Sequence, residues 1–500
     1  MSLRRTTWTA ATSYAAMGSG MITSLLLVRV ATQTLSPEEF GLWSFCFGTV
    51  GYFLLMDFGV TNSLGRMFAD AVVQRDHAEM SGWLYLTMSI LAVQAVFILA
   101  IGLLSRDALL TWFAIPPHLL PDAKRLWTWL IFIQACAMPL RALPGFLYAQ
   151  NRVYQSNIFT ILSSWINLAL FWWWIGKGAG VQSYAYAACF GTAIIQGGYL
   201  ISIFIGKERL RLQFVPLPIR HLRGLFTYSF AIFIQSLTTQ AAAATQGMIL
   251  TKLLGLDAVA TFGVTARLPN LFGQLIWKPY DACVPRWMLR YCANDFEKSR
   301  QEIIAIMRLT VLAVFAGAGI ALLVNSQFIG WWTKPGYFGG NLLTFLLGLT
   351  LLTSTLQHCL SFAFHLNRKM TLYTIVLFLG FLGELGLGIV FVNWFGLIGI
   401  PAATLCVALA FVLWFHVVAG GGIFGINVLG SIYKELLGGG TCLFACFLAL
   451  IVMNSYLSYQ GPIGILLYGI ASLGCCLPLI YRGGSILKDM GFSRLITRAE

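Results

Sequence analysis

Long apolar runs separated by short polar segments fill almost the whole chain. Each run is close to or above the roughly 20 residues that an α-helix needs to cross the hydrocarbon core of a bilayer. We identify about fourteen such runs, which predict an all-α polytopic membrane protein with about fourteen transmembrane helices. The first twelve cover residues 9–33, 40–64, 81–104, 126–148, 156–176, 181–205, 225–250, 260–284, 303–326, 341–365, 372–393 and 397–420, and a final pair covers 436–455 and 462–481.

The composition supports this pattern. Of the 500 residues, 58% are hydrophobic and 10% are charged, and the mean hydropathy is +0.78. Soluble chains average about a quarter charged residues, so a soluble protein is excluded. The segments between the runs are short, which leaves no room for a catalytic domain outside the membrane.

The positive charges are distributed unevenly between the two sides of the predicted bundle. An even number of spans places both termini on one side. If that side is cytoplasmic, twenty-one Lys and Arg residues fall in inner segments and six in outer segments. Lys and Arg in short loops resist translocation, so we predict an N-in/C-in orientation. Most of the net charge of +14 is then a topology signal, and we expect no nucleic-acid partner.

A weak internal repeat divides the chain into two sets of six spans. Four pairs of segments match in the same order at offsets of 215 to 223 residues: Val28-Arg29 with Thr251-Lys252, Phe40-Gly41 with Phe262-Gly263, Gln150-Asn151-Arg152 with Leu366-Asn367-Arg368, and Tyr186-Ala187-Ala188 with Pro401-Ala402-Ala403. A unit with an even number of spans gives parallel repeats that enclose a shared cavity. We predict six-helix lobes at 1–205 and 225–420, a basic cytoplasmic linker at 206–224, and two extra helices with a basic tail at 421–500.

Several cations fall inside or at the ends of predicted spans. An ionisable group at the bilayer centre costs about 2.5–3.5 kcal/mol on insertion scales, so such groups usually face a protein interior or a wet cavity. The candidates for a cationic, phosphate-binding cavity are Arg29, Arg141, Arg267, Lys278 and Lys252. The alternative is that the long side chains reach the outer interface, which we favour for Lys252. Arg308, in the first turns of its span, is interpreted as an interfacial anchor.

Three acidic residues also lie within spans. Asp57 and Asp281 are predicted at similar inner depths in the two repeats, where Asp57 could contact Lys278 and close a cytoplasmic gate. Each acid could equally pair within its own lobe. Glu384 lies near the middle of its span, which suits coupling to H⁺ or Na⁺ or a hydrogen bond to a neighbouring helix.

The eleven cysteines show no paired metal-ligand spacing. Cys442 and Cys446 are one helical turn apart and Cys475 and Cys476 are adjacent, but both pairs lie in apolar runs, where cysteine mostly acts as a small hydrophobic residue. We expect no metal and no cofactor.

Four segments resemble polysaccharide transporters of the multidrug/oligosaccharidyl-lipid/polysaccharide (MOP) exporter superfamily. The opening segment Leu35-Ser36-Pro37-Glu38-Glu39-Phe40-Gly41-Leu42-Trp43 carries most of the similarity. The others are Met56-Asp57-Phe58-Gly59-Val60, Tyr148-Ala149-Gln150-Asn151-Arg152 and Gly396-Leu397-Ile398-Gly399-Ile400-Pro401-Ala402-Ala403.

The resemblance implies two six-helix bundles around a central cavity. It further implies a flippase that moves polyprenyl-diphosphate-linked oligosaccharides across the bacterial cytoplasmic (inner) membrane by alternating access, for lipopolysaccharide, capsule or exopolysaccharide assembly. Arg29, Arg141, Arg267 and Lys278 would then meet the diphosphate. We expect a monomer, with polysaccharide polymerase machinery as a candidate partner.

Two other classes of function compete with the flippase. One is a cation-coupled multidrug or small-solute antiporter. The other is a membrane polysaccharide polymerase or ligase, which would need a sizeable outer loop with catalytic residues. The longest outer segment, 105–125, offers Asp107, His118 and Asp122 among three cations, which is a poor active site.

Overall fold

The structure is a computed structural model, and its regular elements are helices throughout the part of the chain that it describes. That part comprises residues 3–53, 77–150, 152–204, 233–234, 237–238, 241–242, 244–292, 296–333, 336–366, 370–456 and 461–489. Internal contacts divide the chain into two compact units, residues 1–259 and 260–500.

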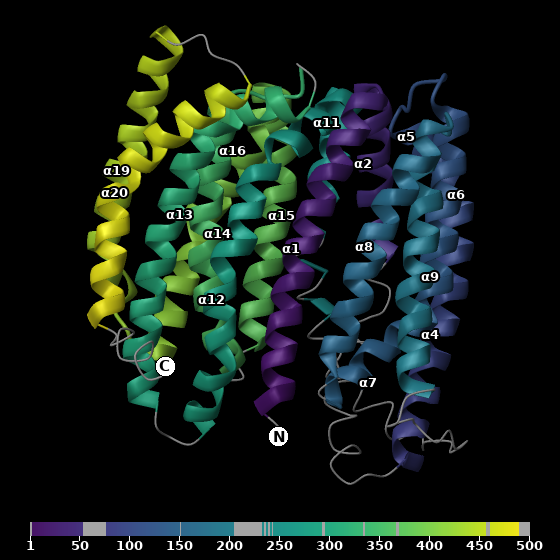
Figure 1. The fold of residues 1–500 in the computed structure, drawn as a ribbon, viewed down its shortest axis with the longest axis horizontal. Helices are drawn as coiled ribbons and strands as arrows, with labels where there is room; N and C mark the ends of the chain where they lie inside the picture. The colour runs from purple at the N-terminus through teal and green to yellow at the C-terminus, as the bar shows by residue number, and fades with distance from the viewer. Residues whose placement is uncertain are drawn as a thin grey trace. The chain divides into compact units, whose positions relative to one another are not determined.

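In the first unit, α4, α6 and α9 run side by side, and α1 packs against α8 (Figure 1). The helices before the unit boundary are α1 (Leu3–Thr34), α2 (Pro37–Gly51), α4 (His77–Leu104), α5 (Arg106–Trp112), α6 (Leu120–Ala137), η2 (Met138–Ala142), α7 (Leu143–Ala149), α8 (Val153–Gly176) and α9 (Gln182–Phe204), and α11 (Leu256–Thr265) crosses it. The core of this unit gathers large buried side chains such as Phe45, Trp127 and Phe146.

In the second unit, α13 is central and packs against α12, α14, α19 and α20. The elements are α12 (Arg267–Cys292), α13 (Phe296–Trp332), α14 (Asn341–Leu366), α15 (Met370–Phe395), η3 (Gly396–Ile398), α16 (Gly399–Val407), η4 (Ala408–Val412), α17 (Leu413–Phe415), η5 (His416–Gly420), α18 (Gly421–Phe424), α19 (Val428–Tyr456) and α20 (Pro462–Asp489). Its core includes Tyr280, Trp287 and Phe424.

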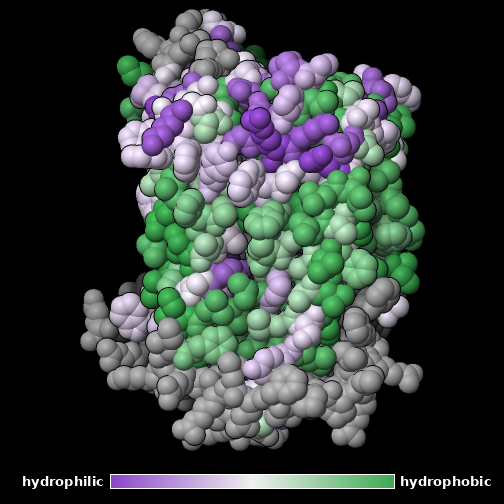
Figure 2. Space-filling model, turned by 90° about the vertical axis from the view of Figure 1, so that its right-hand side faces the viewer, coloured by the Kyte–Doolittle hydropathy of each residue, from purple (hydrophilic) through white to green (hydrophobic). Residues whose placement is uncertain are grey.

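Ten helical stretches in the described residues are long and apolar enough to cross a membrane. They cover eleven of the predicted spans, because the stretch Thr371–Phe424 contains two of them. Of the other three predicted spans, 40–64 is described only to residue 53, and most of 225–250 lies outside the described residues. The third, 260–284, is divided between the short apolar helix α11 and helix α12, and neither is among the ten. One face of the molecule carries a broad apolar belt below a polar rim, as expected for side chains that meet lipid (Figure 2).

The stretch Thr371–Phe424 is a helical hairpin. Gly396 has a φ of 63° and ends α15 in the left-handed conformation, which glycine adopts without strain. Gly383 then packs against Val407, and Gly380 against Val412, so α16 and η4 run back along α15. This turn confirms the predicted division between 372–393 and 397–420.

Ser36, Pro37, Glu39 and Gly41, at the start of α2, each have a structural role. Ser36 is the N-cap: its hydroxyl accepts a hydrogen bond from the Glu39 amide at 3.1 Å, and the Glu39 carboxylate accepts one from the Ser36 amide at 2.8 Å. Pro37 occupies the first turn, where its missing N–H is not needed. One turn later, Gly41 lies directly against the backbone of Leu256, and a Cβ there would overlap the Leu256 carbonyl oxygen.

Gly41→Ala is therefore expected to destabilise the protein by about 3 kcal/mol, because the clash is with backbone atoms that cannot rotate away. Gly263→Ala is the matched control, since Gly263 occupies the corresponding repeat position and a Cβ added there would have no atom within 4 Å. That helical substitution should stabilise by about 0.5–1 kcal/mol. Thermal unfolding in detergent micelles measures both, and equal effects of the two variants would contradict the close-approach explanation.

Candidate functional site

Arg29 lies half-buried on α1, within an apolar span. Polar contacts hold α1 against α8: the Asn157 side-chain amide donates to the Thr12 hydroxyl at 3.1 Å and to the Ser13 hydroxyl at 2.9 Å. In lipid such groups must be satisfied within the protein, so these bonds fix α1 along the neighbouring helix. Because Arg29 is on the same helix, these bonds also determine its position along α8.

Arg141 lies where a helix breaks. Pro139 ends α6 and starts the five-residue 3-10 turn η2, after which α7 begins. Proline removes a backbone donor and frees carbonyls of the preceding turn. The half-buried guanidinium of Arg141 lies within 4.0 Å of the Met138 sulfur, and η2 packs against α4 and α6. A cation is thus placed at an irregular point inside the candidate span Leu120–Leu147.

Lys252 is exposed, and its ammonium group lies against the C-terminus of α5. Its ammonium lies 5.1 Å from the centroid of the Trp112 ring and donates a hydrogen bond to the Trp112 carbonyl oxygen. Trp112 is the last residue of α5, where carbonyls lack intrahelical partners and a cation interacts favourably with the helix dipole. These contacts are those of an interfacial anchor.

A small cavity of about 200 Å³ near this lysine is lined by two acids, Glu38 and Asp257, and by Ala114. Burial, and to a smaller degree the charge of Glu38, raises the pKa of Asp257. His118 lies with its Nε2 3.0 Å from a Glu38 oxygen. Ala114 has a φ of 53°, which is uncommon for a residue other than glycine. Sequence reasoning did not identify this acidic cavity, because Glu38 and Asp257 are more than 200 residues apart.

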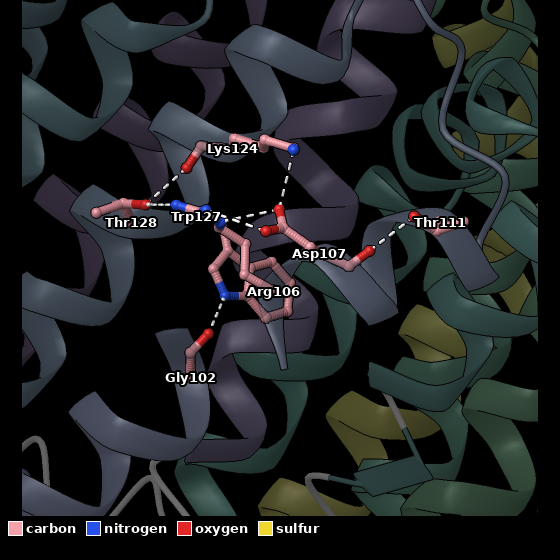
Figure 3. Close-up of polar contacts among 7 residues, drawn as sticks. All are labelled: Gly102, Arg106, Asp107, Thr111, Lys124, Trp127 and Thr128. Atoms are coloured by element: carbon pink, nitrogen blue, oxygen red, sulfur yellow. Dashed lines mark hydrogen bonds and ion pairs between the residues drawn. The ribbon is translucent and has the colours of Figure 1, made fainter. Parts of the chain in front are cut away.

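Segment 105–125, which offered a poor active site in the sequence, contains a network of ion pairs (Figure 3). The Asp107 carboxylate lies 3.2 Å from Arg106 and 3.1 Å from Lys124, and Arg106 also donates to the Thr128 hydroxyl at 3.1 Å. Hydrogen bonds from Arg106 and Lys124 lower the pKa of Asp107, so this carboxyl is a poor proton donor. The Trp127 indole donates to the Gly102 carbonyl at 2.8 Å and anchors α6 to α4.

Asp281 on α12 pairs with a residue that no sequence signal singled out. One of its oxygens lies 2.7 Å from Nε2 of His358 on α14. The imidazole stacks on Trp277, with ring centroids 4.6 Å apart and planes at 13°. The Trp277 indole donates to the Thr355 hydroxyl at 2.8 Å, and this bond holds the indole against α14. Only the periodicity of 353–360 could have suggested that His358 faces α12.

Arg267 and Lys278 lie on the same helix as Asp281 but at different levels. Arg267 is the first residue of α12 and is half-buried, whereas Lys278 is exposed. Eleven residues of α-helix separate them, which is about 16 Å along the axis. The second unit therefore presents two cations at two depths of α12.

Glu384 lies half-buried on α15, next to Gly383 in the chain. Gly380 and Gly383 let Val412 and Val407 approach the α15 backbone. Val412 ends η4, a π-helical segment of the kind frequent at functional sites. Asp57 lies outside the described residues, so its contact with Lys278 stays a prediction.

Three buried thiols form the one group in the described residues with a geometry that could hold a metal. The sulfurs of Cys442, Cys446 and Cys476 all lie within 4.8 Å of one another. Three thiolates would suit a soft metal such as Cu(I). Cys442 donates to the Cys475 carbonyl at 3.2 Å and lies 3.7 Å from the Cys476 sulfur, so neutral thiols also pack well here.

The chain is similar to one protein-family model and to several solved structures. The family model described as polysaccharide biosynthesis protein matches residues 2–287. An inward-facing multidrug-resistance MATE transporter of the MOP superfamily aligns with a TM-score of 0.69 and 16% identity, over 80% of this chain and 95% of its own. The lipid II flippase MurJ, in an inward closed conformation, aligns with a TM-score of 0.66 and 13% identity, over 96% and 99%.

A MOP superfamily transporter from Pyrococcus furiosus, described as having a binding pocket of reverse polarity, aligns with a TM-score of 0.59 and 16% identity, over 88% of this chain and 96% of its own. None of the curated protein sequences matches the chain significantly. At these identities the solved structures show a shared fold. The chain therefore belongs to the polysaccharide biosynthesis protein family, as a multi-pass membrane protein with the fold of MOP-superfamily transporters and flippases.

Proposed function

We propose that this protein flips a polyprenyl-diphosphate-linked oligosaccharide across the bacterial cytoplasmic membrane by alternating access. The cell would use the product for lipopolysaccharide, capsule or exopolysaccharide assembly. The family and the MurJ-like fold support a flippase. The observation that carries the proposal is that Arg29 and Arg141 are half-buried within candidate spans, where the membrane penalises a charge, and that Arg267 is half-buried at the start of α12.

In this proposal the arginines meet the diphosphate. A guanidinium is planar, keeps its proton, and binds phosphate oxygens through two parallel hydrogen bonds. Arg141 in the first unit and Lys278 in the second would supply further positive charge to the diphosphate. Lys252 contacts the substrate only if it leaves Trp112. The oligosaccharide would cross in contact with water, while the prenyl chain remains in lipid.

Reconstitution into liposomes tests the proposal directly. A fluorescent polyprenyl-diphosphate sugar is placed in the inner leaflet, and its arrival in the outer leaflet is measured with an impermeant quencher. We expect transfer well above the rate in protein-free vesicles. Transfer at the protein-free rate together with movement of a cationic drug would instead support the antiporter.

We further propose that the Asp281–His358 pair and Glu384 couple transport to a gradient of H⁺ or Na⁺. The geometric support is the contact between Nε2 of His358 on α14 and a carboxylate oxygen of Asp281 on α12, at 2.7 Å. An imidazole nitrogen can donate or accept a proton in such a contact. Tyr280 on α12 and Cys359 on α14 lie near Asp281. On α13, Glu302 is already paired with Arg286 and Arg290.

His358→Gln is expected to change the pH dependence of flipping, because a glutamine amide cannot exchange a proton with the Asp281 carboxylate. Flipping rates in liposomes at a series of pH values measure this. His118→Gln is the matched control, since His118 also contacts a carboxylate but lies 65% exposed outside the candidate spans. A pH profile of His358→Gln that coincides with the wild type would remove the pair from the mechanism.

Glu384→Gln tests the role proposed for Glu384. Its flipping rate is measured under imposed pH and sodium gradients, and a response equal to that of the wild type would remove Glu384 from the coupling.

A further inference from the structure

A buried carboxylate joins three helices near one end of the second unit. Glu435 on α19 is 1% exposed and accepts hydrogen bonds from Arg308 on α13, at 3.0 Å from Nε and 2.8 Å from one terminal nitrogen. Arg482 on α20 lies 3.4 Å from the same oxygen and also donates to the Lys434 carbonyl at 3.1 Å. Two guanidiniums are thus held side by side on one acid.

This cluster keeps a positive charge and remains reachable. Two arginines against one glutamate leave a net charge of about +1, and Lys434 adds another. The side chains of Arg308 and Arg482 are 31% and 34% exposed. The Arg482 guanidinium packs closely against Gly438, since a Cβ there would lie 3.3 Å from one of its nitrogens. Each arginine therefore retains donors that Glu435 does not occupy.

Neighbouring side chains mark the level of a membrane interface. Tyr433 is 49% exposed and Tyr481 is 84% exposed, and tyrosine is typical of the boundary between lipid and water. Towards the middle of the same two helices, the surface carries large exposed apolar side chains: Leu437, Phe444, Leu448, Leu473, Leu477 and Ile480. A basic cluster at the interface thus lies above a surface suited to acyl chains.

We propose that the Arg308–Glu435–Arg482 cluster binds the headgroup phosphate of an anionic phospholipid, whose acyl chains lie along α19 and α20. Glu435 holds both guanidiniums in place before the lipid arrives, so little side-chain freedom is lost on binding. Charge complementarity selects an anionic lipid, as in other basic pockets between transmembrane helices. This binding site does not depend on which substrate the protein transports.

The test is lipid titration of the purified full-length protein in detergent, followed by native mass spectrometry and thermal unfolding. Phosphatidylglycerol should bind and raise the midpoint of unfolding, and phosphatidylcholine should do so much less. Arg482→Gln should weaken phosphatidylglycerol binding about tenfold, the order expected for one charge-assisted hydrogen bond. Glu435 keeps Arg308 as a partner in this variant, so the fold is retained, and its lipid-free midpoint verifies that. Arg482→Lys should recover part of the binding.

Lys488→Gln is the matched control, because Lys488 is an exposed cation on the same helix outside the cluster. It should bind phosphatidylglycerol as the wild type does. The proposal is overturned if Arg482→Gln binds phosphatidylglycerol normally, if both variants lose binding equally, or if phosphatidylcholine binds as tightly. Inorganic phosphate alone should produce no shift at millimolar concentration. An equal shift with phosphate would identify a free-anion site in place of a lipid site.

Discussion

Arg29→Ala and Arg267→Ala are each expected to slow flipping of the lipid-linked sugar by about 10- to 100-fold. A hydrogen bond to a charged group contributes about 1.5–3 kcal/mol, and each 1.4 kcal/mol is a factor of ten. Because both arginines are half-buried on helices of the bundle, water cannot fully replace the lost contact with the diphosphate. The liposome assay with the fluorescent sugar measures the rate at equal amounts of folded protein.

Arg106→Ala is the matched control for this prediction. Arg106 is also a partly buried arginine, but it lies in the ion-pair network with Asp107 and Lys124 and is not among the residues proposed to meet the diphosphate. We expect its flipping rate to stay close to that of the wild type. Arg29→Lys keeps the charge but loses the planar fork, and it should fall between the wild type and the alanine variant. Wild-type rates in both Arg29→Ala and Arg267→Ala would rule out the diphosphate clamp.

Glu435→Ala should destabilise the protein by about 3–5 kcal/mol, the usual cost of removing one partner from a buried ion pair. The variant leaves Arg308 and Arg482 facing each other without their shared counterion, and like charges in a poorly solvated site repel strongly. Thermal unfolding in detergent micelles at neutral pH gives the measurement, with the loss of folded yield as a second readout.

Glu297→Ala provides the comparison for this change. Glu297 pairs with Arg300 one turn away at 2.9 Å, but its side chain is 68% exposed. Water screens such a surface pair, so the expected effect is below about 1 kcal/mol. If the two variants unfold at the same temperature, the buried carboxylate does not stabilise the contact between α13, α19 and α20.

The helices were largely predictable from the chain, because the apolar pattern follows from the cost of exposing polar groups to lipid. Even breaks in the helices had local signals. Pro139 lacks a backbone donor, which is a local reason for the irregular turn η2 beside Arg141. The predicted division near residue 396 coincides with the left-handed Gly396. These features depend on neighbours within a few residues.

The partners of the charged residues were not predictable in the same way. The position of Arg308 in its span predicts an interfacial anchor, yet Arg308 binds a buried glutamate 127 positions away. His358 lies 77 positions from Asp281. Neither spacing has a periodic signal, because such pairs depend on which faces of separate helices meet. Hydropathy also says little about those faces when lipid and protein interior are both apolar.

By itself, therefore, the sequence determined that this is a multi-pass helical membrane protein, where most of its spans lie, and which basic residues the membrane would penalise. Its opening segment already contained the capping box and the close-packed Gly41 that shape α2. Only the tertiary structure decided which of those charges are paired. It brought Cys476 against Cys442 and Cys446, two arginines onto Glu435, and a histidine onto Asp281. The reason is physical: insertion into a membrane is governed residue by residue along each helix, whereas pairing within it is governed by helix packing across the fold.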